Sequence, residues 1–206
     1  DVGGIDSKKI FDFLLMLKVK YQSKKPHFVI YGASYDFNMF LRNLREQDAR
    51  EINKRVQNDD ISYTQVILAD NIQYEVMTIP RKMLQIKHGK TSIKIFDCIG
   101  FFQSSFIEAI KNWLPEVVDS KEFKQMVDGK NNRSDFANWK LKDIIAYTDI
   151  ELKWLVAIMN KLAKSLSDLD LDIASFHGAG AIAKAMLDKH LNNCLLYTSD
   201  AADEGL

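Results

Sequence analysis

The chain has 206 residues, 47% of them hydrophobic, which fits one domain with a sizeable core or one domain with an appendage. Its 28 basic and 28 acidic residues cancel, which argues against a protein that coats DNA through an overall positive charge but not against a local nucleic-acid groove. No apolar run reaches the roughly 20 residues of a membrane span, so we expect no membrane partner. Cys98 and Cys194 lack metal-ligand spacing, which favours a reducing, cytoplasmic setting.

The first part of the chain predicts a helix, a strand, a second helix and several extended segments. Apolar residues recur at helical spacing over residues 7–22. The apolar run Phe28–Tyr31 suits a buried parallel strand, Gly32 interrupts it, and Asp36 opens a helix with a charged continuation to about Gln57. Four extended segments follow, at residues 63–68, 74–79, 82–87 and 92–96, with a hairpin turn around Gly89.

The second part of the chain predicts mostly helix. Helical spacing returns from Phe102 to Trp113, and Pro115 ends it. Residues 119–140 are polar and predict an irregular excursion, whereas Asp143 to about Leu166 predicts the longest helix. Because strand-like segments lie among helices, the pattern indicates an α/β or α+β fold.

Both ends of the chain are unusual. The first residue is Asp1 rather than Met, and helical periodicity follows almost at once. The segment CLLYTSDAADE, residues 194–204, breaks the preceding pattern and resembles the conceptual translation of a transposon adapter used in preparing sequencing libraries. We therefore expect residues 194–206 to be a foreign tail and the natural protein to continue past about Asn193, with a genuine disordered tail as the alternative.

Two places carry acids in positions that favour function. Asp36 follows the predicted strand at the start of a helix, where α/β folds expose polar residues to ligands, although Asp is also a common helix cap. Tyr147 and Glu151 are four residues apart, so they share one helix face beside an apolar stripe. We expect Glu151 to be half-buried and directed toward the sheet, and a solvated acid is the alternative.

Three segments in this order carry a resemblance: IYGASYDFNMFLRNL, RKMLQIKHGKTSIKIFDCIGFFQSSFIEAIKNWL, and YTDIELKWLVAIMNKL with the later FHGAGAIAKAMLDKH. Together they resemble the exonuclease domain of family B DNA polymerases of the protein-primed or organellar, viral and plasmid type, over nearly all of residues 1–193. The resemblance implies an α/β fold with a ribonuclease H-like mixed sheet flanked by helices, lacking its first strands here. Residues 1–170 would be the 3′–5′ exonuclease domain, and residues 171–193 would begin the connection toward a polymerase domain.

The resemblance also implies roles for five residues. Asp36 matches the second exonuclease motif, whose Asp binds the catalytic metals, and the preceding Tyr35 matches an aromatic residue that contacts the 3′-terminal strand. Tyr147 and Glu151 match the third motif, Tyr-x-x-x-Asp, with Glu in place of Asp. Asp97 matches a position beside the bound strand, where the next residue is Cys98 instead of the family's Ser.

Phosphodiester hydrolysis explains these residue types. Two Mg²⁺ or Mn²⁺ ions require several hard carboxylate ligands, for which Asp36 and Glu151 are the candidates, and Tyr147 would orient the attacking water. The family's first motif, Asp-x-Glu, is expected before residue 1, so we expect the fragment alone to be inactive.

The expected partners are the single-stranded 3′ end of DNA and, through a polymerase domain outside this chain, deoxynucleotides. The expected location is the cytoplasm of the host cell of a virus or mobile element, with an organelle as the alternative. A stand-alone exonuclease of the same fold and a catalytically degenerate nucleic-acid-binding domain are the alternative functions.

One further pattern, Gly178-x-Gly180-x-x-Ala183, imitates a dinucleotide-binding fingerprint. A full strand–helix–strand unit does not follow it before the expected foreign tail. Its small residues are instead expected to allow close backbone approach, a phosphate contact at a helix start or, with more weight, tight helix packing.

Overall fold

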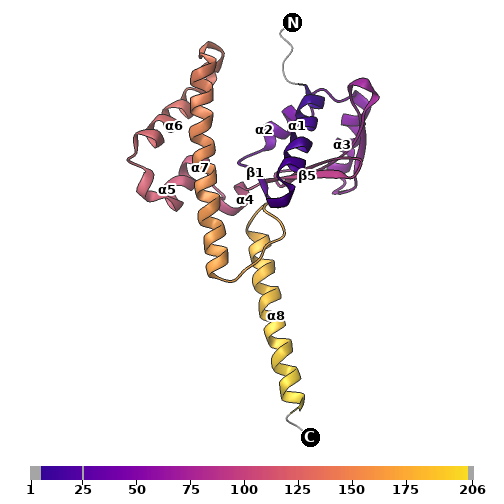
Figure 1. Ribbon diagram of the computed structural model, residues 1–206, viewed down its shortest axis with the longest axis vertical. Helices are drawn as coiled ribbons and strands as arrows, with labels where there is room; N and C mark the ends of the chain where they lie inside the picture. The colour runs from indigo at the N-terminus through magenta and orange to yellow at the C-terminus, as the bar shows by residue number, and fades with distance from the viewer. Residues whose placement is uncertain (1–5, 25, 204–206) are drawn as a thin grey trace. The chain divides into compact units, whose positions relative to one another are not determined.

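The computed structural model describes residues 6–24 and 26–203, with side chains described as far as Leu191. The chain divides into two units: Asp1–Phe101 with Ala174–Ala181, and Phe102–Ile173 with Ile182–Leu206. The first unit contains the β-sheet, and the second is helical (Figure 1).

A five-stranded mixed sheet forms the centre of the first unit. Its strands are β1 (Phe28–Ile30), β2 (Thr64–Ile67), β3 (Gln73–Ile79), β4 (Met83–His88) and β5 (Thr91–Asp97), in the order β1-β5-β4-β3-β2. β1 and β5 are parallel, with Val29 opposite Phe96, and the other three pairs are antiparallel. A two-residue turn at Gly89 joins β4 to β5, and its φ of +55° is one that glycine adopts readily. The sheet confirms the α/β class predicted from the sequence, including the parallel placement of the Phe28–Tyr31 run.

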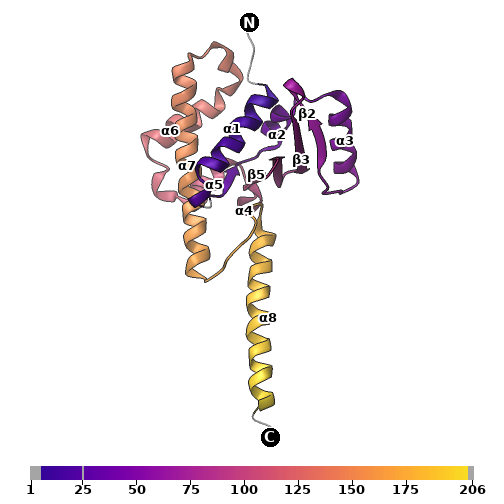
Figure 2. The same ribbon diagram turned by 45° about the vertical axis from the view of Figure 1, so that its right-hand side comes forward.

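Helices α1 (Ser7–Lys20), α2 (Ser34–Phe40) and α3 (Glu46–Gln57) cover one face of this sheet (Figure 2). Asp6 caps α1 by accepting a hydrogen bond of 2.8 Å from the Lys9 N–H. Apolar side chains at alternate strand positions meet the helices, and the shared core contains Phe11, Leu15, Phe37, Ile52, Val66, Tyr74, Val76, Leu84, Ile86, Ile93 and Ile95. Short 3₁₀ helices at Gln22–Lys24 and Ala69–Asn71 complete the connections.

The opposite face of the sheet is largely polar along one row. Gln65, Glu75, Lys87 and Ser92 are successive cross-strand neighbours, and Lys87 forms an ion pair of 2.9 Å with Glu75. Gln85 donates a hydrogen bond of 2.7 Å to the Ser92 hydroxyl. This alternation follows from the two-residue period of a strand, which places one side chain in the core and the next on the other face.

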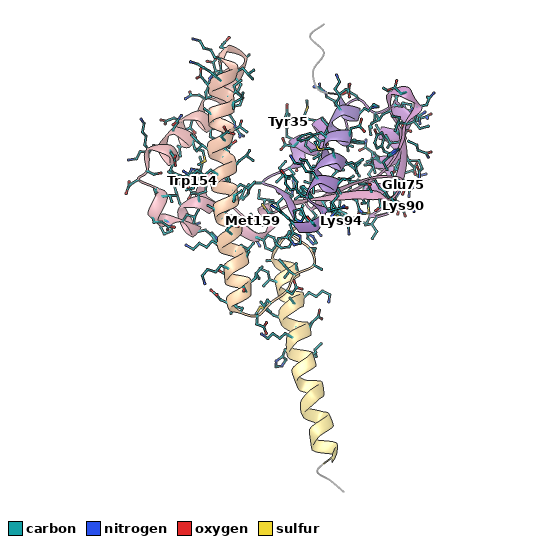
Figure 3. All side chains as sticks on the ribbon, viewed as in Figure 1. Tyr35, Glu75, Lys90, Lys94, Trp154 and Met159 are labelled. Atoms are coloured by element: carbon teal, nitrogen blue, oxygen red, sulfur yellow. The ribbon has the colours of Figure 1, made fainter. Side chains whose placement is uncertain are left out.

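The second unit is built on the 28-residue helix α7 (Leu141–Asp168). Its other elements are α5 (Phe106–Trp113), the 3₁₀ helix Pro115–Val117, α6 (Lys121–Asn131) and the 3₁₀ helix Arg133–Asn138. α5 and α6 pack against α7 through buried side chains that include Phe106, Ile110, Phe123, Met126, Trp154, Ile158 and Leu162. Trp154 points to the side of α7 on which α5 and α6 lie (Figure 3). α4 (Ile99–Phe102) and α8 (Ala179–Asp203) each have residues in both units.

Two of the predicted elements were wrong. The helix predicted from Asp36 to about Gln57 is two helices, because the backbone of Arg45 is extended (ψ 145°) before α3 begins. The irregular segment predicted for residues 119–140 contains α6, which starts where the Ser120 hydroxyl accepts a hydrogen bond from the Phe123 N–H and which buries Phe123 and Met126. The long helix predicted for residues 143–166 is confirmed. In the described part of the chain, none of the helices has the combined length and apolarity that crossing a bilayer requires.

A buried carboxylate ties α3 to the sheet. Asp48 is 5% exposed, accepts two hydrogen bonds of 2.9 Å from the Arg45 guanidinium, and accepts a third of 3.2 Å from the Ile67 N–H in β2. The hydrogen bond from Arg45 holds the pKa of Asp48 below its ordinary value of 3.8, although burial opposes this shift. The ionised form of Asp48 therefore stabilises the fold.

We expect Asp48→Asn to lower the free energy of unfolding at neutral pH by about 1–3 kcal/mol, because the change removes a charge-assisted hydrogen-bond acceptor from a buried position. Since the folded-state pKa is depressed, the stabilisation is present above pH 3.8 and is lost as the pH falls through the folded pKa. Urea unfolding followed by circular dichroism should therefore show the difference from wild type shrinking below that pH. Glu46→Gln, at an exposed ion pair with Arg50, is the control and should change little. An Asp48 effect that does not depend on pH would contradict the assignment.

Candidate functional site

The first part of the candidate site is the start of α2, next to the end of β1. The β1–α2 turn, residues 31–33, contains Gly32 at φ +70°, and Tyr35 and Asp36 lie in the first turn of the helix. Tyr35, labelled in Figure 3, is 71% exposed. Asp36 is half-buried. Because β1 and β5 are parallel, their carboxyl ends meet at this edge of the sheet, which is where α/β proteins bind ligands.

Asp97, the last residue of β5, is turned toward the protein interior. It is 1% exposed, and its Oδ1 accepts hydrogen bonds from the N–H groups of Gly32 (2.8 Å) and Ile99 (3.1 Å). Its Oδ2 accepts a third from the Ala33 N–H (2.8 Å). In this arrangement the side chain is buried, and its role as a nucleic-acid contact stays a prediction. Asp97 holds the β1–α2 turn.

Cys98 extends the pairing of β1 and β5 beyond the strands. Its N–H donates to the Ile30 carbonyl at 2.9 Å, and its Sγ donates to the same oxygen at 3.2 Å. The side chain is fully buried, and burial raises the pKa of the thiol to about 12. Cys98 is therefore a neutral structural group, and it does not reach solvent as a nucleic-acid contact would require.

The glycine pattern at residues 178–183 includes a close approach of two backbone segments. A Cβ atom on Gly100 would lie 2.3 Å from the His177 carbonyl oxygen, and Gly178 has a φ of +154° beside the Gly100 backbone. Residues 169–178 form no strand, so the unit that a dinucleotide fingerprint needs is missing from this stretch. Close backbone approach therefore accounts for Gly178, while Gly180 has no neighbouring atom within 4 Å of the Cβ position.

The second part of the candidate site lies on α7. Tyr147 and Glu151 share one face of the helix, as predicted, and both contact Arg133. The Arg133 Nε donates to the Tyr147 hydroxyl oxygen at 2.9 Å, and its Nη2 donates to Glu151 at 2.5 Å. Lys130 adds a weaker ion pair with Glu151 at 3.4 Å. The Glu151 side chain is 18% exposed, so it is a paired, mostly buried acid rather than a solvated one.

Tyr147 is held in an aromatic environment. It is 3% exposed, and its ring centroid lies 5.6 Å from that of Phe136 and 6.1 Å from that of Trp139. Burial and the neighbouring Glu151 raise the pKa of Tyr147 well above its ordinary value, so the phenol stays protonated at neutral pH. Burial also lowers the pKa of Lys130, with the charge of Glu151 opposing that shift.

The described residues do not form a metal site by themselves. Among the described side chains, in residues 6–24 and 26–191, no group of three or more His, Cys, Asp or Glu residues is arranged to hold a metal ion. Arg133 and Lys130 form ion pairs with the carboxylate of Glu151, and these two positive charges would repel a divalent cation at that position. The roles of Asp36 and Glu151 as metal ligands stay predictions.

The structure thus brings the predicted site residues together in two groups. Tyr35, Asp36 and Asp97 belong to the first unit, and Tyr147 and Glu151 belong to the second. The predicted convergence of Asp36 and Glu151 on shared cations stays a prediction. The sequence analysis missed Lys130 and Arg133 because they lie 21 and 18 residues before Glu151, in the segment that was predicted to be irregular.

Comparisons with known proteins add no relative: no protein-family model, no curated protein and no solved structure matches this chain.

Gly129 sets the position of the Tyr147 ring, and this can be tested. A Cβ atom on Gly129 would lie 2.3 Å from Tyr147 Cδ2, so Gly129→Ala should displace the ring and lower the free energy of unfolding by about 1–3 kcal/mol. The loss should occur even though Ala favours a helix over Gly by about 1 kcal/mol. Gly180→Ala, in a helix with open space around the Cβ position, is the matched control and should be neutral or stabilising. Urea unfolding measures both, and equal stabilities would show that Tyr147 can move aside.

Proposed function

We propose that this chain is most of a 3′–5′ exonuclease domain of ribonuclease H-like fold, from a DNA polymerase of family B, and that it binds the single-stranded 3′ end of DNA. The observation that carries the proposal is the exposed Tyr35 beside Asp36, at the edge where the parallel strands β1 and β5 end. An exposed aromatic ring at a ligand-binding edge is suited to stacking on a base, and the acid beside it is suited to the metal-assisted chemistry of a terminal phosphodiester.

The arrangement on α7 agrees with the third motif of the resemblance. Tyr147 is a neutral phenol beside the carboxylate of Glu151, four residues further along one helix face. A protonated Tyr hydroxyl next to a carboxylate is a group that can orient a water molecule by hydrogen bonding. The order of the three resembling segments, with Asp36 first and Glu151 last, agrees with this assignment.

The free edge of β1 supports the sheet part of the proposal. Among the described strands, β1 pairs with β5 on one side and ends the sheet on the other. An unpaired edge presents backbone donors and acceptors to a further strand. In a longer protein we propose that the strand carrying Asp-x-Glu lies there, completing the ribonuclease H-like sheet.

The metal requirement limits the proposal to the longer protein. Two Mg²⁺ or Mn²⁺ ions, when bound, supply an activated water and stabilise the charge on the attacking and leaving oxygens. Asp36 and Glu151 are too few ligands for them, and Glu151 is paired with Arg133 and Lys130. We therefore propose DNA binding, and no cleavage, for these 206 residues alone. Deoxynucleotides would be bound by a polymerase domain outside the chain.

A second candidate is a catalytically degenerate nucleic-acid-binding domain, and one observation favours it. The Arg133 and Lys130 ion pairs satisfy Glu151 without any metal, as expected for an acid that has only a structural role. A stand-alone exonuclease of the same fold would use the same residues as the first candidate. Metal-dependent cleavage by the longer protein separates the degenerate domain from both enzymes.

Tyr35→Ala should weaken the binding of a single-stranded oligonucleotide by roughly tenfold, because stacking on an aromatic side chain contributes about 1–3 kcal/mol per base. Stability should be unchanged, since the ring is 71% exposed. Tyr21→Ala, at an exposed tyrosine after α1, is the matched control. Fluorescence anisotropy with an oligonucleotide that ends in a free 3′ hydroxyl measures the three affinities. Equal affinities would remove Tyr35 from the interface.

Asp36→Ala in a longer protein that includes the Asp-x-Glu strand should reduce exonuclease activity by about a hundredfold or more, because loss of even an outer-shell partner of a metal costs 10- to 100-fold. Circular dichroism checks that the variant keeps its fold. The assay is release of nucleotides from a mispaired 3′ end in the presence of Mg²⁺. Unchanged nuclease rates would contradict the role of Asp36, and a wild-type protein without metal-dependent cleavage would favour the degenerate domain.

A further inference from the structure

We propose that Asp97 is a positioning residue: it fixes Tyr35 and Asp36 for the 3′ end of DNA without contacting DNA itself. This inference rests on the proposed function of the α2 start. It replaces the direct contact that the sequence suggested for Asp97 with an action through the backbone of the β1–α2 turn.

The hydrogen bonds of Asp97 act where α2 begins. Ala33 is the residue before the helix, and its carbonyl accepts the first helical hydrogen bond, from the Phe37 N–H at 2.8 Å. Ala33 has no side chain able to cap the helix, and Asp97 accepts the Ala33 N–H from a strand 64 residues further along the chain. Asp97 therefore satisfies the backbone N–H of the residue that precedes the helix, as the Glu side chain of a capping box does in other helices.

The same side chain fixes the turn that precedes the helix. Gly32 has φ +70°, which lies in the left-handed region that glycine adopts readily, and its N–H donates to Asp97 at 2.8 Å. Tyr35 and Asp36 follow within a few residues, on the first helical turn. Any displacement of residues 32 and 33 therefore moves both side chains.

Asp97 is itself held rigidly. Its N–H donates to the Lys82 carbonyl at 2.8 Å, and the N–H of the next residue, Cys98, donates to the Ile30 carbonyl at 2.9 Å. Two residues further on, Gly100 packs against the backbone of His177 and Gly178. The backbone around Asp97 is therefore held in place, which a residue needs if it is to position other residues.

The change Asp97→Asn isolates this role. The amide has the shape of the carboxylate, but its nitrogen is a donor, so in either orientation it faces at least one backbone N–H that loses its acceptor. Asp48→Asn is the matched control: Asp48 is also a buried acid that accepts a backbone N–H, from Ile67, but it lies at α3 and not at the β1–α2 turn. A loss of stability alone would affect both variants.

The experiment combines amide hydrogen exchange by NMR with oligonucleotide binding by fluorescence anisotropy on the full 206-residue chain. Asp97→Asn should raise the exchange rates at Gly32 and Ala33 by about tenfold or more, since their acceptor is lost. It should also lower the affinity for a single-stranded oligonucleotide by about fivefold, which is less than the loss expected for Tyr35→Ala. Asp48→Asn should raise these exchange rates by no more than its loss of global stability explains, and it should leave oligonucleotide binding unchanged. Unchanged exchange in Asp97→Asn, or a binding loss no larger than in Asp48→Asn, would overturn the proposal.

A measurement on the wild-type chain needs no variant and decides the case if Asp97→Asn fails to fold. A direct contact between Asp97 and DNA would require its oxygens to release Gly32 and Ala33. If Asp97 only positions other residues, the amide exchange of Gly32 and Ala33 should stay slow, or become slower, when the oligonucleotide binds. Faster exchange on binding would refute a positioning role. If the wild-type chain binds no oligonucleotide, the proposed function fails, and the exchange rates of Asp97→Asn still show whether Asp97 holds the turn.

Discussion

The hydrogen bonds between Asp97 and three backbone N–H groups are the constraint on which the candidate site depends. They connect the end of β5 to the β1–α2 turn, and thus link two segments 65 residues apart in the chain. A buried N–H without an acceptor is costly, so the turn and the carboxyl group require each other. Because Tyr35 and Asp36 follow this turn directly, the position of an exposed aromatic ring and an acid is determined by a residue that no ligand can touch.

Charge determines what the α7 face can do. Glu151 is one methylene longer than the Asp of the motif that it resembles, and its carboxylate is bound by Arg133 and Lys130. Arg133 also binds the Tyr147 hydroxyl, so one guanidinium holds both side chains. A divalent ion at Glu151 would have to replace these partners, which means that metal binding and the ion pairs compete. The sequence therefore suggests a catalytic role for Glu151, whereas its contacts in the structure favour a structural role.

Local patterns in the sequence identified the elements whose signals are local. Alternating apolar residues and the turn at Gly89 were enough to predict β2 to β5, and the spacing of Tyr147 and Glu151 was enough to place them on one helix face. α6 was missed because Phe123 and Met126 are its few buried side chains in a segment dominated by polar residues. The roles of Asp97 and Arg133 depend on partners 64 and 18 residues away, and no local spacing indicates such pairs.

The balanced charge of the chain makes this geometry more important for the DNA binding that we propose. A strongly basic protein gains affinity from the phosphates wherever the strand lies, and it tolerates small displacements of its side chains. With 28 basic and 28 acidic residues, this chain has no such general attraction, so the DNA affinity that we propose would have to come from a few placed contacts such as the Tyr35 ring. Stacking is short-ranged and requires a fixed ring position. On the function proposed above, the inward-facing Asp97 would contribute to binding by keeping Tyr35 and Asp36 where a terminal nucleotide can meet both.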